Sequence, residues 1–206
     1  MSVRLQRNGA VDLKKGDAVD LKKGDRNLTK LRVGLGWDAN TSGPEEFDLD
    51  ASAFLLTASG STRNAQDLVF YGALDHPSGS VQHMGHNLVG GTGAGRDDDE
   101  QILIDLTKIP EAIQEIVFTV TIYDYDVRHQ NFGMVQNAYI RVIDESSQGA
   151  PEELVRYDLT EDFSLNTAVI AGRIVRNGAS WKFVASSEKS SGGLRELCEK
   201  YGVKVL

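Results

Sequence analysis

Apolar and polar residues alternate along much of the chain, and this pattern predicts many short β-strands. The clearest case is residues 116–123, Ile-Val-Phe-Thr-Val-Thr-Ile-Tyr, in which every second side chain would face the same side of a sheet. Residues 168–176 and 180–184 flank Asn177-Gly178, a dipeptide that favours a tight hairpin turn. Further strands are predicted at residues 31–37, 51–57, 68–71, 81–83, 102–106, 138–143 and 154–159.

Helical signals are sparse by comparison. Apolar residues at helical spacing predict one helix over residues 194–201, with Gly202 as its stop signal and Cys198 buried as a small apolar side chain. A single helical turn is predicted at residues 110–114. Many strands with frequent turns and one terminal helix indicate a mainly β fold. We expect a two-sheet β-sandwich with a few short helices, including one near the C-terminus.

The N-terminal residues 1–27 contain a tandem duplication. Residues 10–17 and residues 18–25 both read Ala-Val-Asp-Leu-Lys-Lys-Gly-Asp. Two copies are too few for a solenoid, so we expect one copy to pair with a strand and the other to loop out. A functional lysine cluster is the alternative. Because no linker interrupts the pattern, we expect residues 1–206 to form a single domain.

The composition narrows the class of protein. With 206 residues, 40% of them hydrophobic and 25% charged, the chain can bury a core. Its net charge of −8 argues against nucleic acid as a partner and allows cations or basic partners. Cys198 is the single cysteine, so no internal disulfide is possible. The chain has no long apolar run and its first residues do not resemble a signal peptide, so we expect a cytoplasmic location.

Two acidic runs carry the candidate chemistry. Asp48 and Asp50 would share one face of a strand, and a second run, residues 97–100, follows a glycine-rich segment. Calcium takes six to eight oxygens from carboxylates, amides and carbonyls, and loops gather at the ends of a sandwich. The spacing excludes an EF-hand, because Ala53 stands where that loop needs glycine. The oxygen-bearing candidates are Asp38, Asp48, Asp50, Asn87, Asp97, Asp98, Asp99 and Glu100. A solvated acidic rim is the alternative.

Other chemistry has less support in the sequence. Asp124 and Asp126 stand near Arg128, which favours an ion pair or a loop cap over a share in metal binding. His83 and His86 have a zinc-like spacing, but His76 and His129 lie elsewhere, so we expect all four to be loop histidines that face water. No nucleophile elbow or phosphate loop is present, so we expect no enzyme activity. A metal-dependent hydrolase that uses a carboxylate pair stays an open alternative.

Seven segments follow one another along the chain in a distinctive order: Gly34-Leu35-Gly36-Trp37-Asp38, the run from Phe47 to Leu56, Asn87-Leu88 with Asp98-Asp99-Glu100, the run from Phe118 to Asp124 with Arg128-x-Gln130-Asn131-Phe132-Gly133, Arg156-Tyr157-Asp158-Leu159, Trp181-Lys182-Phe183 and Gly192-Gly193-Leu194. Together these segments resemble the TerD family of tellurium-resistance and general stress proteins. The resemblance covers nearly the whole chain from about residue 28, together with one copy of the duplicated element.

This resemblance implies a bacterial, cytoplasmic, non-enzymatic β-sandwich that binds two calcium ions in clustered acidic loops. Carried over residue by residue, the implied ligands are Asp38, Asp48, Asp50, Asn87, Asp98, Asp99 and Glu100, with Gly34 as a carbonyl donor. The implied partners are calcium and other tellurium-resistance proteins. A calcium-dependent scaffold, or a protein that meets a membrane surface through its bound ions, is the alternative.

The second acidic run departs from the family pattern. His86 stands where the family usually has aspartate, and the loop is longer and carries Arg96. Asp97 occupies a position where glycine is usual and could replace the missing acid. We therefore expect the wall formed by residues 85–100 to differ most from the family's metal site.

Overall fold

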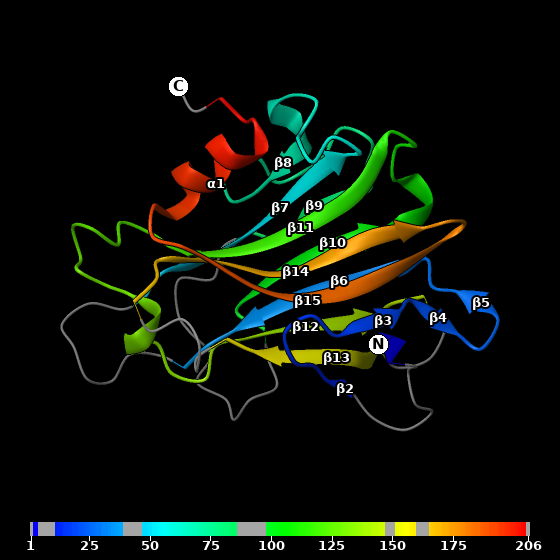
Figure 1. Cartoon of the computed structure of the whole chain (residues 1–206), viewed down its shortest axis with the longest axis horizontal. Coiled ribbons are helices and arrows are strands. Elements are labelled where there is room, and N and C mark those ends of the chain that lie inside the picture. The colour runs from blue at the N-terminus through cyan, green and yellow to red at the C-terminus, as the bar shows by residue number, and fades with distance from the viewer. Residues whose placement is uncertain are drawn as a thin grey trace.

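The computed structural model describes residues 2–3, 11–38, 47–85, 98–146, 151–159 and 165–204, and its strands form two large sheets packed face to face (Figure 1). Sheet A has, in spatial order, the strands β1 (Ser2–Val3), β3 (Ala18–Asp20), β15 (Ser180–Ser190), β14 (Ala168–Asn177), β11 (Ile113–Ile122), β7 (Leu49–Thr57) and β8 (Leu68–Val69). Sheet B has β2 (Val11–Asp12), β13 (Glu152–Asp158), β12 (Tyr139–Asp144), β6 (Lys30–Gly36), β10 (Glu100–Asp105) and β9 (Val81–His83). The predicted β-sandwich is confirmed.

Short elements complete the fold. A small hairpin is formed by β4 (Lys22–Lys23) and β5 (Arg26–Asn27). The 3₁₀ helices are η1 (Ala65–Asp67), η2 (Leu106–Lys108) and η3 (Phe132–Met134), and the α-helix is α1 (Gly193–Tyr201). The hairpin predicted at Asn177-Gly178 is confirmed, because β14 and β15 pair up to Asn177 and Ser180.

The alternation along the strands divides the apolar side chains between two cores. On β11, Ile116 and Phe118 face the space between the sheets, whereas Val117 faces outward. The outward core packs under α1, which lies along the outer face of sheet A (Figure 1) and contributes Leu197 and Cys198. Each fully buried side chain of this kind stabilises the fold by about 1.5–3 kcal/mol.

The predicted C-terminal helix is confirmed, and Gly202 ends it in the left-handed conformation, with φ of 78°. Glycine adopts this conformation without the strain that a Cβ atom would add. Cys198 is buried as expected, and burial raises the pKa of its thiol, which makes it a poor nucleophile. None of the helices in the described ranges is both long and apolar enough to cross a membrane.

The duplicated element does not behave as predicted. We expected one copy to loop out, but both copies pair, and they pair with different sheets. In the first copy the Leu13 amide donates to the Arg156 carbonyl of sheet B at 3.0 Å. In the second copy the equivalent Leu21 amide donates to the Trp181 carbonyl of sheet A at 2.9 Å. Both leucine side chains are buried, so the duplication joins the edges of the two sheets.

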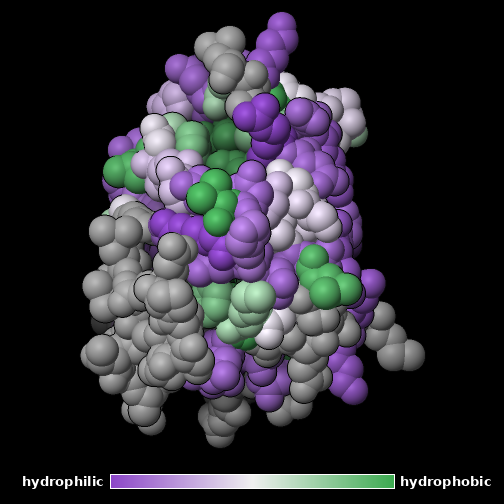
Figure 2. Space-filling view, turned by 90° about the vertical axis from the view of Figure 1, so that its left-hand side faces the viewer, coloured by the Kyte–Doolittle hydropathy of each residue, from purple (hydrophilic) through white to green (hydrophobic). Residues whose placement is uncertain are grey.

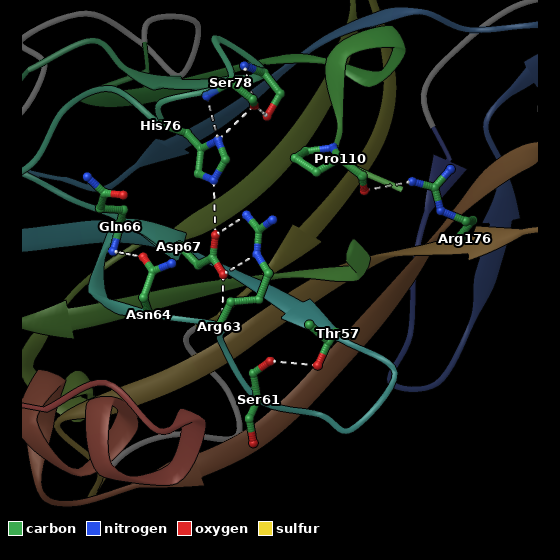
Figure 3. A network of polar contacts seen from close by, with 11 residues as sticks. Thr57, Ser61, Arg63, Asn64, Gln66, Asp67, His76, Ser78, Pro110 and Arg176 are labelled. Carbon is green, nitrogen blue, oxygen red and sulfur yellow. Dashed lines mark hydrogen bonds and ion pairs between the residues drawn. The ribbon is translucent and has the colours of Figure 1, made fainter. Parts of the chain in front are cut away.

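The helical turn predicted at residues 110–114 is also wrong. The chain turns at residues 111–112, and β11 begins at Ile113, which pairs with Thr57 of β7. The Arg176 side chain fixes this turn by donating to the Ile113 carbonyl at 3.1 Å. It also donates to the Pro110 carbonyl at 3.4 Å (Figure 3). These two carbonyls accept from a side chain of the neighbouring strand β14, and the local sequence does not reveal that interaction.

Candidate metal centre

The predicted acidic segments meet at one end of the sandwich, where the backbone of one segment binds the carboxylates of another. Asp99 Oδ2 accepts a hydrogen bond of 2.9 Å from the Trp37 amide. Glu100 Oε2 accepts a hydrogen bond from the Ala51 amide on the edge of β7, so Glu100 of sheet B reaches sheet A. The same oxygen lies 3.5 Å from Nε2 of His83. Both carboxylates are buried and held in fixed directions.

Asp38 and Asp48 lie in the two chain segments that adjoin this contact: Asp38 follows Trp37, and Asp48 stands three residues before Ala51. The exposed Asp38 carboxylate accepts a hydrogen bond of 2.6 Å from the Asn137 amide group. The Asp48 carbonyl accepts a hydrogen bond of 2.9 Å from the Tyr123 amide at the end of β11. We use "acidic end" for the region formed by Asp38, Asp48, Asp98, Asp99 and Glu100. It gathers the ends of β6, β7, β10 and β11.

Asp98 lies flat on the outer face of sheet B and explains why β6 contains glycine. Its Oδ1 accepts from Arg141 Nε at 2.7 Å and from the Tyr139 hydroxyl at 3.3 Å. A Cβ atom on Gly34 would lie 2.2 Å from Asp98 Cγ, so a larger residue would force the carboxylate to move. Arg141 also binds Glu153 at 2.8 Å and thus joins two acids.

Burial controls the ionisation of the Asp98 carboxylate and the Tyr139 hydroxyl. It raises the pKa of Asp98 above the ordinary range, although hydrogen bonds and charge from Arg141 oppose the shift. Burial and the neighbouring Asp98 charge together raise the pKa of Tyr139 to about 12, so its hydroxyl stays protonated and donates. The second oxygen, Asp98 Oδ2, is buried and has no hydrogen-bond partner within the described residues.

Asp50 is not directed toward the other acids. It is the second residue of β7, and its side chain lies on the outer face of sheet A, opposite to Ala51. There it lines a pocket with Tyr71, Tyr123 and Asp124, and none of residues 98–100 lines that pocket. Burial, followed by the charge of Asp50, raises the pKa of Tyr71. The Asp50 side chain therefore lies apart from residues 98–100 of the second acidic run.

The predicted ligands thus divide into three groups. Asp38, Asp48 and residues 98–100 lie at the acidic end, whereas Asp50 lines the pocket on sheet A. Asn87 and Asp97 lie outside the described residues. Gly34 lies inside β6, paired on both sides, beneath Asp98. Among the side chains that the structure describes, no three His, Cys, Asp or Glu residues converge as they would around one ion.

The histidines correct the expectation that all face water. His76 and His83 are buried, with exposures of 3% and 2%, and each faces a carboxylate of another segment. His129 is exposed as expected, and His86 lies outside the described residues. Zinc spacing was a poor guide here, because the partners of both buried rings are distant in sequence.

Asp67 lies at the centre of a buried polar network that sequence reasoning missed (Figure 3). Its carboxylate accepts from Arg63 Nε at 2.9 Å, from a terminal Arg63 nitrogen at 2.6 Å and from the Arg63 amide at 2.8 Å. His76 Nε2 lies 3.1 Å from the same carboxylate, and Nδ1 lies 2.7 Å from the Ser78 hydroxyl. The four-residue spacing of Arg63 and Asp67 was the available signal.

The second acidic pair caps a loop. Asp126 Oδ1 accepts from the Val127 amide at 2.9 Å, which is the loop cap that the sequence favoured. Asp124 lies two residues after the end of β11 and has a positive φ of 49°, which a non-glycine residue adopts at some cost. The Arg128 guanidinium lies 5.7 Å from the centre of the Tyr123 ring. Asp124 and Asp126 both line the pocket that contains Asp50.

Comparison with known proteins identifies the family. A model of the TerD domain matches residues 10–201. The chain belongs to the TerD family. Among its TerD-family relatives, "Uncharacterized protein YceE" of Bacillus subtilis (strain 168) is 51% identical over 206 residues, covering all of both chains. "General stress protein 16U" of the same strain is 46% identical over 179 residues, which cover 86% of this chain and 90% of the relative.

Two further comparisons agree with the TerD assignment. "Tellurium resistance protein TerD" of Serratia marcescens is 43% identical over 205 residues, covering all of both chains. A crystal structure of a homologue of telluride resistance protein (TerD) from Streptomyces coelicolor A3(2) superposes with a TM-score of 0.66. That alignment covers 83% of this chain and 95% of the other at 20% identity, and it supports the TerD fold alone.

Proposed function

We propose that this TerD-family chain is a non-enzymatic, calcium-binding module of a bacterial stress- and tellurite-resistance system. The biological setting rests on the relatives, which include proteins named for tellurium resistance and for general stress. The calcium proposal rests on chemistry at the acidic end. The observation that carries it is the buried Asp98 Oδ2, which has no hydrogen-bond partner in the described part of the chain.

The donor set suits a hard cation. Hydrogen bonds at the acidic end engage Asp98 Oδ1, Asp99 Oδ2 and Glu100 Oε2. These bonds hold the carboxylates in fixed directions and limit the ordering that metal binding would otherwise require. Calcium accepts oxygen ligands in flexible geometry, whereas zinc favours histidine and cysteine. Oxygen donors therefore favour calcium over zinc at this end.

The proposed ligands are Asp38, Asp48, Asp98, Asp99 and Glu100, with Asn87 and Asp97 from outside the described residues. Asp50 stays a predicted ligand, although its side chain lines a different pocket. The proposed number of two ions rests on the family resemblance. When bound, calcium would neutralise the carboxylates and tie the loop ends of both sheets together.

Calorimetry and thermal unfolding with calcium test the proposal. Chelator-treated protein should release or absorb heat on calcium addition, and its melting temperature should rise by mass action. Asp99→Asn combined with Asp48→Asn should abolish most of the heat. The matched control is Glu111→Gln with Glu199→Gln, two exposed acids far from the acidic end in sequence, which should leave the heat unchanged. No heat and no melting shift at millimolar calcium would refute the proposal.

A second candidate function is calcium-dependent contact with an anionic membrane. Exposed apolar side chains near Asp50 and Asp126 favour it: Tyr71 and Tyr123, which line the pocket with Asp50, are each 41% exposed, and Val127, next to Asp126, is 75% exposed. Figure 2 shows the face at the left-hand end of Figure 1, where hydrophobic patches alternate with hydrophilic ones. Bound calcium would bridge these carboxylates to lipid phosphates. Co-sedimentation with phosphatidylserine vesicles should then require calcium, and sedimentation that ignores chelator would exclude this function.

A further inference from the structure

Ser78, His76 and Asp67 stand in the order of a nucleophile, a base and a carboxylate (Figure 3). The Ser78 hydroxyl lies 2.7 Å from Nδ1 of the His76 ring, and Nε2 of the same ring lies 3.1 Å from the Asp67 carboxylate. This arrangement activates serine on unrelated folds, and it is recognised by geometry rather than by sequence position. None of the three residues belongs to the acidic end.

The neighbours of the His76 ring determine which nitrogen carries the hydrogen. A carboxylate only accepts, so Nε2, which faces Asp67, carries the hydrogen. A backbone amide only donates, and the Ser78 amide donates to Nδ1 at 3.2 Å. Nδ1 therefore presents its lone pair toward Ser78, which is the state that a base needs in order to take the hydrogen of a hydroxyl.

The three side chains differ in their access to solvent. Asp67 and His76 are 1% and 3% exposed, whereas Ser78 is exposed. Burial and two partners hold the ring in one orientation, while a reagent in solution reaches the serine oxygen directly. The Ser80 hydroxyl accepts from the Ser78 hydroxyl at 2.7 Å, so the hydrogen of Ser78 has a second acceptor in the resting protein.

The backbone of the same turn argues against turnover. The Gly79 amide donates to the His76 carbonyl at 2.8 Å, and the Ser80 amide donates to the Ser78 hydroxyl at 3.2 Å. With the Ser78 amide on Nδ1, all three amides of residues 78–80 are engaged and none is left to stabilise an oxyanion. A good leaving group compensates for this in a first step, but the alkyl ester formed on serine has a poor leaving group. One reaction per chain is therefore expected.

The charges near Ser78 favour an acyl group over a phosphoryl group. Asp75 is exposed three residues before Ser78, and the Asp67 carboxylate lies on the far side of the His76 ring. Both carboxylates repel an anionic phosphoryl donor and have no such effect on a neutral ester. The electrophile that suits this serine is a neutral, activated carbonyl compound.

We propose that Ser78 is a modification site that accepts an acyl group from an activated ester or thioester. The Ser78 oxygen attacks the carbonyl carbon, and its hydrogen passes to Nδ1 of His76. The bond from the carbonyl carbon to the leaving alcohol or thiol then breaks, and the leaving group takes the hydrogen from Nδ1. The products are acylated Ser78 and the free alcohol or thiol, with the neutral ring restored. Calcium takes no part in this reaction.

The test uses p-nitrophenyl acetate as the acyl donor, in the presence of chelator, and peptide mapping by mass spectrometry to locate the acetyl groups. Ser59 is the internal control, because it is also exposed but its hydroxyl lies 2.8 Å from the Thr57 hydroxyl instead of a histidine. General-base assistance accelerates such reactions by about 10²–10⁴-fold, so Ser78 should be acetylated at least roughly tenfold faster than Ser59. No acetyl group on Ser78, or equal rates at the two serines, would overturn the proposal.

The variant His76→Asn separates the base from the turn. An asparagine side-chain oxygen can accept from the amide two residues later, as in an ordinary Asx turn, but an amide oxygen is not a base. If His76 had a purely structural role, Ser78 acetylation would be unchanged in the folded variant, whereas a base at this position requires the rate to fall to that of Ser59. A melting curve checks folding, and the wild-type comparison of the two serines stands whatever the stability of the variant. Calcium heats should match those of the wild type, so failure of one proposal is distinguishable from failure of the other.

Discussion

Replacing Asp67 by asparagine should destabilise the protein more than any exposed substitution. The carboxylate is 1% exposed and receives three hydrogen bonds from Arg63 in addition to its contact with His76. Asparagine has nearly the same shape as aspartate, but its NH2 group is a donor and would face the Arg63 nitrogens, which are donors themselves. At least one donor therefore loses its acceptor, and the buried arginine contact loses its counter-charge.

The expected loss follows from how far the pair is buried. Breaking a buried ion pair from one side costs about 3–5 kcal/mol. Because the Arg63 side chain is 36% exposed, water screens part of the interaction, and we take the lower end, about 3 kcal/mol. For a chain of this size, that corresponds to a fall in melting temperature of roughly 6–12 °C.

The loss should also depend on pH in a defined direction. Burial alone would raise the pKa of Asp67, but the hydrogen bonds from Arg63 and His76 outweigh it, and the folded-state pKa is lowered. The carboxylate therefore contributes its full stability above its unfolded pKa, about 3.9, and the contribution is lost as pH falls through the lower folded pKa. The difference between wild type and Asp67→Asn should shrink below about pH 4.

Chemical denaturation of both proteins between pH 7 and pH 3 measures this difference. The control is Asp75→Asn, an exposed carboxylate whose oxygen accepts from Gln82 at 2.8 Å, and its cost should be within about 1 kcal/mol. A cost below 1 kcal/mol for Asp67→Asn, or a cost that stays constant with pH, would show that the network contributes little as an ionised unit.

Four further single substitutions test the sheets and their outer faces. Gly34→Ala places a Cβ 2.2 Å from Asp98 Cγ, and we expect chemical denaturation to show a loss of about 1–3 kcal/mol in the free energy of unfolding. An unchanged melting curve would contradict this expectation. Arg141→Leu should cost about 3–5 kcal/mol because it leaves Asp98 buried without its partner, and adding Asp98→Asn should recover part of this in a double-mutant cycle. Leu13→Ala and Leu21→Ala should each cost about 2–5 kcal/mol, and a neutral effect of either would mean that its copy of the repeat does not pack.

Periodicity was sufficient to predict the architecture, because it reports directly on burial. The run at residues 116–123 and the Asn177-Gly178 turn placed the central strands and a hairpin of sheet A correctly. The helix before Gly202 was predicted for the same reason, since its signals are local. The turn after Pro110 was not, because a distant arginine decides its conformation.

The candidate site shows the same division between local and distant information. The sequence located the acidic residues, but it could not tell that Asp98 pairs with Arg141 or that Asp50 faces away from Glu100. Such pairings depend on which strands are neighbours, and the sequence does not specify strand order. His83 was misjudged for this reason, since its carboxylate neighbour, Glu100, comes from the adjacent strand β10.

The duplicated element gives the folding reaction two equivalent choices. Residues 10–17 and 18–25 are identical, yet each copy pairs with a different sheet edge, so an eight-residue slide presents the same side chains to the wrong edge. Such a misaligned state is a local decoy on the folding landscape, and the flanking residues must resolve it. Refolding should therefore show a slow phase that grows when these flanks are mutated and disappears when the two copies are made different. The repeat that joins the two sheets also makes their alignment ambiguous while the chain folds.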